Sequence, residues 1–251
     1  MPRTVLLTEG DSPLGGALTR VLAARGFKVI ATRERSGSDA VLPAGSLAGV
    51  HSVAWNRRSP VSARTVLLDA LNLAGAHDQS GGIDEAIILE PPSPASAVFL
   101  DASSADIEKT FDDAKGPVFI AKEILAHFTH RGAGVLCFVL GSTGVGLLQT
   151  SLRESLRGAA SAIISSPFVP TILVNGFQTT STDPEEYAQF IDRTMEERAR
   201  RISGRWFTCQ SRGGFFRKMP PGAADRMPPG AAGRMPPGAA GNVAGGQPRK
   251  G

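Results

Sequence analysis

The sequence predicts a single α/β domain with a doubly wound parallel sheet, followed by a disordered C-terminal tail. Three observations support this fold class. Short apolar runs typical of buried strands alternate with longer segments of helical periodicity. A glycine-bearing turn joins the first apolar run to the first helical segment. Residues 134–140 form a near-continuous apolar run, as expected of a central parallel strand that helices cover on both faces.

The predicted strands are short apolar runs separated by helices or turns. They are expected, in chain order, at residues 5–7, 28–32, 50–55, 84–89, 134–140, 171–175 and 206–209. Strands that alternate with helices in this way are joined by right-handed crossovers and form a parallel sheet.

The predicted helices carry apolar residues at helical spacing. They are expected, in chain order, at residues 14–25, 60–74, 104–131, 149–164 and 184–201. Gly26 can end the first helix, and the pair Ser59–Pro60 is typical of a cap and first turn for the second. Residues 116–117, Gly-Pro, are expected to bend or split the long third helix.

The composition changes after the last predicted strand. The unit Met-Pro-Pro-Gly-Ala-Ala occurs three times from Met219 with a period of eight residues, and it contains nothing that can form a core. We therefore predict a domain over residues 1–215 and a disordered tail over 216–251. Two interpretations of the tail stay open: a tether for an acidic partner, or a tandem duplication without a role.

The charge balance argues against specific binding of nucleic acid. Residues 211–251 hold seven of the 27 Lys and Arg residues but only one of the 23 acidic residues, so the domain itself is slightly acidic. No apolar run approaches the ~20 residues of a membrane helix, and the N-terminus does not resemble a secretory signal. Cys137 and Cys209 form no disulfide framework. We expect a cytoplasmic protein.

No metal site is predicted. His127 and His130 lie three residues apart at the end of a predicted helix, where both could reach one ligand. No third residue with metal-binding spacing accompanies them, and a histidine that stabilises the C-terminal end of a helix is the more common arrangement.

The turn over residues 8–15 reads Thr-Glu-Gly-Asp-Ser-Pro-Leu-Gly and is typical of a dinucleotide-binding unit, where a phosphate sits on a helix N-terminus. Glu9 and Pro13 stand where such a turn normally has its first two glycines, and Gly15 keeps the third. We expect Pro13 to remove one amide donor, and the Glu9 carboxylate to lie near the phosphates and repel them. The candidate cofactor-binding residues of this turn are Thr8, Gly10, Ser12, Leu14 and Gly15.

Over residues 3–215 the chain resembles the short-chain dehydrogenase/reductase family. The family's Thr-Gly-x-x-x-Gly-x-Gly turn falls on the turn just described, and its passage before the active-site strand resembles residues 106–119. Its fifth strand and serine resemble residues 135–144, and its closing strand resembles residues 204–214. The resemblance implies a Rossmann-like fold.

The resemblance implies four catalytic positions, of which one matches. Ser142 falls on the serine that holds the substrate carbonyl. Arg153 falls on the tyrosine that acts as acid and base, Arg157 on the lysine that lowers its pKa, and Asp113 on the asparagine of the water relay. The single tyrosine, Tyr187, lies far beyond the required place. Arginine stays charged and cannot exchange a proton near neutral pH.

The resemblance also suggests a cofactor and an assembly. Arg33 falls where family members that prefer NADP keep a basic residue for the 2′-phosphate, although a solvated charge beside Glu34 is an alternative. We predict weak binding of NADP at most, and a homodimer or tetramer through helices 104–131 and 149–164. The predicted function is a catalytically impaired scaffold or a regulatory, nucleotide-sensing subunit. The alternative is an NADP-dependent oxidoreductase with an atypical active site.

Overall fold

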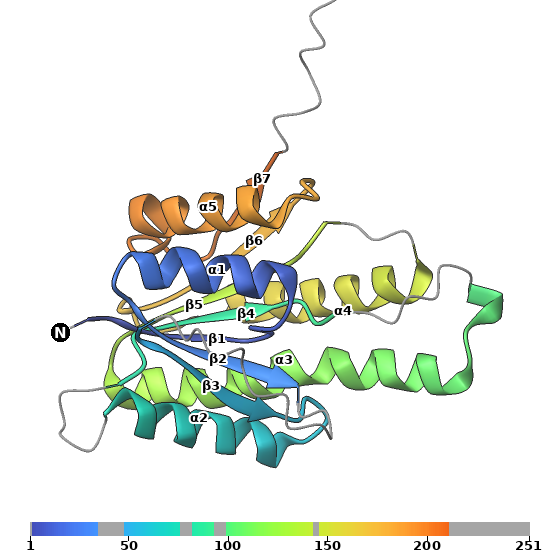
Figure 1. Cartoon of the computed structure of the whole chain (residues 1–251), viewed down its shortest axis with the longest axis horizontal. Helices are drawn as coiled ribbons and strands as arrows, with labels where there is room; N and C mark the ends of the chain where they lie inside the picture. The colour runs from blue at the N-terminus through green and yellow to red at the C-terminus, as the bar shows by residue number, and fades with distance from the viewer. Residues whose placement is uncertain (1, 35–47, 76–81, 93–98, 143–145, 211–251) are drawn as a thin grey trace, which may run out of the picture. The chain divides into compact units, whose positions relative to one another are not determined.

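The computed structural model describes residues 2–34, 48–75, 82–92, 99–142 and 146–210. Within them, one parallel sheet has the strand order β3-β2-β1-β4-β5-β6-β7, which confirms the doubly wound sheet (Figure 1). Its strands are β1 (Thr4–Leu7), β2 (Lys28–Glu34), β3 (Val50–Trp55), β4 (Glu85–Leu89), β5 (Gly134–Val139), β6 (Ile172–Thr179) and β7 (Trp206–Cys209). Because the order reverses between β1 and β4, a crevice is expected at the carboxyl ends of these strands.

Helices cover both faces of the sheet (Figure 1). Helices α1 (Pro13–Ala24) and α5 (Pro184–Thr194) pack side by side on one face. The other face carries α2 (Pro60–Ala74), α3 (Ser104–Arg131) and α4 (Leu147–Ile164), with α3 in the middle. Two short elements complete the order: the 3₁₀ turn η2 (Phe99–Asp101) and the π-helical turn η3 (Met195–Ala199).

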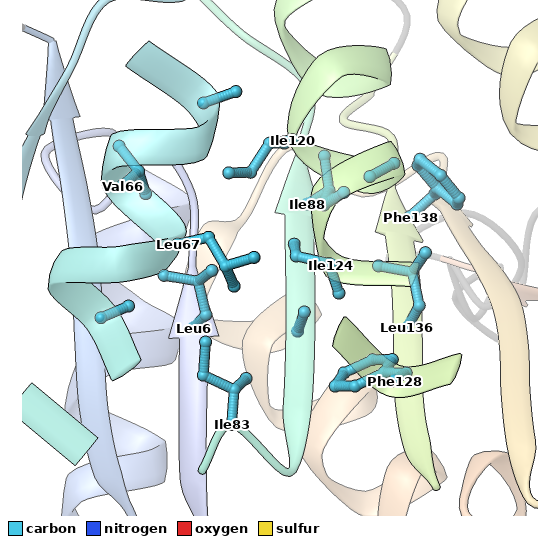
Figure 2. Packing of buried hydrophobic residues seen from close by; sticks show 14 of the residues in the cluster. Leu6, Val66, Leu67, Ile83, Ile88, Ile120, Ile124, Phe128, Leu136 and Phe138 are labelled. Carbon is cyan, nitrogen blue, oxygen red and sulfur yellow. The ribbon is translucent and has the colours of Figure 1, made fainter. Parts of the chain in front are cut away.

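Alternation along the strands separates the core into two apolar layers. Leu6 of β1 points toward α2 and α3, whereas its neighbours Val5 and Leu7 pack under α1 and α5. Figure 2 shows the first layer, where Ile124 and Phe128 of α3 lie against the central strands. Successive strand residues point to opposite faces, so each central strand contributes to both layers.

The long helix α3 is not split at Gly116–Pro117, which corrects one of the two expectations for this site. Proline at this position removes one intrahelical hydrogen bond. Both residues are buried, however, and a Cβ on Gly116 would lie 2.8 Å from the Cβ of Arg57. Close packing against the loop before α2 therefore favours a continuous helix despite the missing hydrogen bond.

The last helical segment also differs from the expectation. Residues 184–201 were predicted as one helix, but α5 ends at Thr194 and continues as η3. The wider turn closes with the Arg200 amide donating to the Met195 carbonyl, and it brings the Arg200 guanidinium to 2.7 Å from Glu85. The ion pair with a buried carboxylate gives this deviation a physical reason.

Other features of the described residues agree with the sequence. Both cysteines are buried, and no disulfide joins them. None of the described helices is both long and apolar enough to cross a membrane. The predicted tail, residues 216–251, lies outside the described residues. The cytoplasmic location stays a prediction.

Candidate functional site

A cleft of about 320 Å³ opens at the carboxyl edge of the sheet. The N-terminal ends of α1 and α5 form one wall, and the ends of β4, β5 and β6 form its floor, with Gln149 of α4 at the side. Its polar side chains are Ser12, Glu90, Ser142, Gln149, Thr179, Ser181, Thr182, Asp183 and Tyr187. Parallel α/β sheets bind ligands at this edge, so the cleft is the candidate site.

The turn before α1 is built as a helix start. The Ser12 hydroxyl accepts from the Gly15 amide at 3.0 Å and donates to the Glu9 carbonyl at 2.7 Å, so it caps the helix. Pro13 occupies the first helical position, where its missing amide costs little. The Leu14 amide belongs to the first turn, which has no intrahelical acceptor, and Leu14 lines the cleft. Of the predicted cofactor-binding residues, Ser12 and Leu14 therefore lie at the cleft.

The other three predicted residues of the turn have structural contacts. The Thr8 hydroxyl is buried and accepts from the Leu89 amide at 2.8 Å, which ties β1 to β4. The Gly10 amide donates to the Thr32 carbonyl at 2.8 Å. A Cβ on Gly15 would lie 2.0 Å from the Glu9 carbonyl oxygen, so only glycine permits this approach of helix to strand. These residues shape the turn, and the amide of Gly10 is already engaged.

Glu9 keeps the backbone shape of the glycine that it replaces. Its φ is 52°, in the left-handed region that glycine adopts without strain. Its side chain is 2% exposed and faces Arg57, with Oε1 and Nε 3.1 Å apart. The carboxylate is therefore buried against Arg57 and does not line the cleft, whereas the sequence suggested that it faces the phosphates.

Arg57 is the centre of a buried ionic group that the sequence did not reveal. Its guanidinium is 2.6 Å from Glu34 and 3.3 Å from Asp113, in addition to Glu9. We call these four residues the Arg57 cluster. Three carboxylates share one cation here, and burial raises the pKa of Glu9 to about 7 against the opposing effect of Arg57. Burial also raises the pKa of Asp113. Asp113 thus pairs with Arg57, whereas the resemblance implied a place in a proton relay.

Arg33 lies at the end of β2, next to the Arg57 cluster. Its Nη2 donates to the Ser52 hydroxyl of β3 at 2.6 Å, and its side chain is half-buried. This contact orients Arg33 along the sheet edge. The proposed contact with a 2′-phosphate stays a prediction.

Ser142 and Glu90 meet at the floor of the cleft. Both follow the ends of neighbouring strands, β5 and β4, and both line the cavity. The Gly141 amide donates to Glu90 Oε2 at 2.8 Å, which fixes the carboxyl group beside the serine. Burial raises the pKa of Glu90, although the Gly141 amide and nearby Arg153 oppose this effect. Glu90 is a titratable group at the cleft that sequence analysis missed; its place directly after a central strand was the available signal.

The two arginines at the family's catalytic positions lie in different surroundings. Arg153 is buried in α4 and donates through Nη1 to the Gly141 carbonyl, next to Ser142. Its Nε has no hydrogen-bond partner among the described residues. Arg157, one turn later, is exposed. Arg153 therefore reaches the strand end behind the serine, and Arg157 does not take part.

Tyr187 lies at the cleft, although along the chain it comes far after the expected tyrosine position. Because α5 begins at the carboxyl edge, its first turns lean over the end of β5. The Tyr187 hydroxyl donates to the Leu140 carbonyl at 3.0 Å. Burial raises its pKa well above the ordinary value, so this phenol keeps its proton.

No group of three or more possible metal ligands occurs among the described residues, so none supports a metal site there. His127 is half-buried on α3, and burial lowers its pKa. His130 is exposed in the last turn of the same helix. Neither histidine lies at the cleft.

Comparisons with known proteins agree with the predicted family. No family model matches the chain. A short-chain dehydrogenase, cctT of Talaromyces islandicus, is 25% identical over 199 residues, covering 75% of this chain and 68% of that protein. The resemblance to the short-chain dehydrogenase/reductase family is thereby confirmed.

Solved structures confirm the fold. A 3-ketoacyl-(acyl-carrier-protein) reductase from Brucella melitensis, complexed with NADH, superposes with a TM-score of 0.68 at 13% identity, over 83% of this chain and 96% of its own. An oxidoreductase of the family from Burkholderia thailandensis has a TM-score of 0.65 at 19% identity, over 84% and 92%. ElxO with NADP bound has a TM-score of 0.66 at 13% identity, over 84% and 98%. The chain has the fold of short-chain oxidoreductases.

Proposed function

We propose that this protein is a catalytically impaired relative of the short-chain dehydrogenases that binds a nucleotide weakly and acts as a regulatory or scaffold subunit. One observation carries the proposal. The position that aligns with the catalytic tyrosine holds Arg153, and this arginine is buried with its guanidinium on the Gly141 carbonyl. A guanidinium stays charged near neutral pH, so it cannot give a proton to a developing alkoxide.

The neighbouring positions support the same conclusion. Exposed Arg157 has no tyrosine whose pKa it could lower, and Asp113 is paired with Arg57. Ser142 lines the cleft and could hold a carbonyl oxygen, but it does not replace the missing proton donor. Loss of a positioned acid typically costs about 10²–10⁴-fold in rate.

A nucleotide fits the site in part. The first turn of α1 faces the cleft, and the Leu14 amide has no acceptor within its helix. Structural neighbours bind NADH or NADP, which supports the same ligand class here. Against tight binding stand the missing amide of Pro13, the engaged amide of Gly10 and the lack of Lys or Arg among the described lining residues. Binding of NADP(H) with modest affinity is the expectation.

Calorimetry with NADPH and a turnover assay test both parts of the proposal. We expect weak binding of NADPH, and no oxidation of NADPH above background with simple ketones, aldehydes or quinones. Tight binding of NAD(H) that ignores Arg33→Ala would contradict the nucleotide assignment. Robust turnover that Ser142→Ala abolishes would contradict the impairment.

A second candidate function is an NADP-dependent oxidoreductase with an atypical active site. Glu90 is the residue that specifically supports it. A bound reduced nicotinamide would supply a hydride to a carbonyl carbon. Glu90, whose pKa is raised by burial, would be the group that supplies the proton to the carbonyl oxygen while Ser142 orients that oxygen. If turnover is found, Glu90→Gln should abolish it and leave NADPH binding unchanged.

A symmetric dimer, or a tetramer of dimers, through α3 and α4 remains part of the proposal. These helices pack side by side on one face, and two large apolar side chains on them face solvent: Phe111 is 56% exposed and Leu147 is 50% exposed. A second copy of the chain would cover such residues. Light scattering should report a dimer or larger at tens of micromolar, and Phe111→Asp should reduce it to a monomer. A monomeric native protein would contradict the assembly.

A further inference from the structure

The Arg57 cluster holds more negative charge than its single cation balances. Arg57 is 3% exposed, and the side chains of Glu9 and Asp113 are 2% and 1% exposed. Glu34 completes the group but is about half exposed. With every carboxyl group ionised, these four residues would together carry a net charge of two negative units. Burial of unbalanced charge is costly, and a buried group avoids this cost by keeping a proton.

The hydrogen-bond pattern shows which carboxyl oxygens could hold that proton. Among the described residues, Glu9 Oε1 and Asp113 Oδ2 are buried without a hydrogen-bond partner, as is Arg57 Nε. The ion pair between Glu9 and Arg57 is close but is not aligned as a hydrogen bond. A buried carboxyl oxygen without a donor gains no hydrogen bond from ionisation, and only the charge of Arg57 compensates for the loss of solvation, so the geometry favours a protonated acid at one of these positions.

The charges that act on Glu9 come from four parts of the fold. Arg57, before α2, favours its ionised form. Asp11 in the turn, Glu34 on β2 and Asp113 on α3 all oppose it. Lys109 and Arg58 act in turn on Asp113, where both favour ionisation. Burial outweighs Arg57, and the pKa of Glu9 is about 7.

The backbone of Glu9 belongs to the turn that faces the cleft. Its carbonyl accepts from both the amide and the hydroxyl of Ser12, the residue that caps α1. Gly15 packs against the same carbonyl. The residue whose charge changes is therefore joined through its own backbone carbonyl to the helix start where a phosphate would bind.

We propose that the Arg57 cluster takes up a proton when a phosphate-bearing nucleotide binds at the α1 turn, so that nucleotide affinity falls as pH rises through neutrality. This inference rests on the proposed nucleotide binding and adds its regulation. A protonated Glu9 removes one negative charge from beneath the site of an anionic ligand. The Glu9 charge is buried and does not contact the ligand, so we expect its loss to change affinity by about three- to tenfold.

Calorimetric titration with NADPH at pH 6, 7 and 8 tests the inference. The native protein should bind about three- to tenfold more weakly at pH 8 than at pH 6. Repeating the titration at pH 7 in buffers of different ionisation enthalpy should show uptake of about a quarter to two-fifths of a proton per nucleotide. NADPH carries a phosphate that itself titrates near pH 6, so the comparison is made with Glu9→Gln. That variant keeps the shape of the side chain and should lose the Glu9-dependent part of both effects.

Two further variants keep the experiment decisive. Asp113→Asn removes a charge that raises the pKa of Glu9, so it should move the transition in affinity to lower pH. Asp69→Asn, an exposed change on α2, should behave like the native protein. A melting curve at each pH shows that each variant is folded.

The outcomes separate this inference from the function on which it rests. Binding of NADPH with the same pH dependence and proton uptake in the native protein and Glu9→Gln would overturn the inference and leave nucleotide binding intact. No binding of NADPH to any variant at any pH would overturn the proposed nucleotide binding, and the inference with it.

Discussion

Two buried ionic groups lie at opposite edges of the same sheet, and they are built in opposite ways. At the amino edge, one carboxylate is shared by two arginines: Glu85 accepts from Arg200 at 2.7 and 3.0 Å and from Arg3 at 3.3 Å. At the carboxyl edge, three carboxylates share Arg57. Each group has a fully buried glutamate, at position 85 or at position 9.

The difference lies in how well each glutamate is satisfied. Both oxygens of Glu85 accept hydrogen bonds from guanidinium groups, in the paired geometry that suits arginine and carboxylate. Glu9 has a cation close by, but its Oε1 has no hydrogen bond among the described residues. A well-satisfied pair stabilises the fold, whereas a poorly satisfied one beside a cleft is the arrangement typical of functional sites. We therefore expect the group at the amino edge to contribute mainly to stability, and the group at the carboxyl edge to carry the proposed proton-linked binding.

Removal of the arginine from each group should give the largest difference. Arg57→Met leaves three carboxylates without their cation, and it should lower the free energy of unfolding by about 3–5 kcal/mol at pH 8. The loss should be smaller at pH 5, where Glu9 holds its proton. Arg200→Met leaves Glu85 its contact with Arg3, so it should cost about half as much and depend little on pH over this range. Urea denaturation at both pH values measures both variants, and equal losses would remove the distinction between the edges.

The pH dependence of stability sharpens the comparison at Glu9 itself. The pKa of Glu9 rises from 4.5 to about 7 on folding, so between these values the folded chain holds a proton that the unfolded chain has released. Stability therefore falls as pH rises through this window and is level above it. The free energy of unfolding therefore changes by about 3 kcal/mol across this pH window.

Glu9→Gln removes the ionisable group, so it isolates the contribution of this proton to the free energy of unfolding. Between pH 4.5 and 7.5, the native protein should lose about 3 kcal/mol relative to the variant, as measured by urea denaturation at each pH. Glu123→Gln, a half-buried change on α3, serves as the control and should follow the native curve. Parallel curves for the native protein and Glu9→Gln would show that the cluster holds no such proton.

The fold could be predicted from sequence because its signals are local. The apolar run of β5 and the Ser-Pro cap of α2 each fix an element without knowledge of its neighbours, and both elements were predicted close to their observed bounds. The exceptions had non-local causes. Pro117 stays in an unbroken helix because its surroundings bury it, and α5 gives way to η3 where Arg200 reaches Glu85.

The site was harder to predict because its contacts join distant segments. Ser142 and the α1 turn could be placed from motifs, whereas Glu90, Tyr187 and Arg57 depend on which strand ends and helix starts meet at one edge. The Arg57 cluster joins residues 9, 34, 57 and 113, and no spacing in the sequence indicates such a group. A signal did exist at Glu9. An acidic residue directly after the buried first strand requires a counter-charge if its side chain is also buried, but the sequence does not indicate which segment supplies it.

The smallest expected effect concerns the C-terminal tail, and it tests whether the contrast between the edges belongs to the domain alone. Deletion of residues 217–251 removes six of the seven cations in residues 211–251 and one acid. Because the repeats are expected to bury nothing, the melting temperature should stay within experimental error, and so should the pH dependence assigned to Glu9. The deletion should instead weaken salt-sensitive retention on an anionic resin, as expected if the tail contacts acidic partners. A fall of several degrees in melting temperature would show that the tail packs on the domain. A changed pH profile without such a fall would mean that tail cations help to balance the acids around Arg57, and the imbalance at the carboxyl edge would then be smaller than the domain alone indicates.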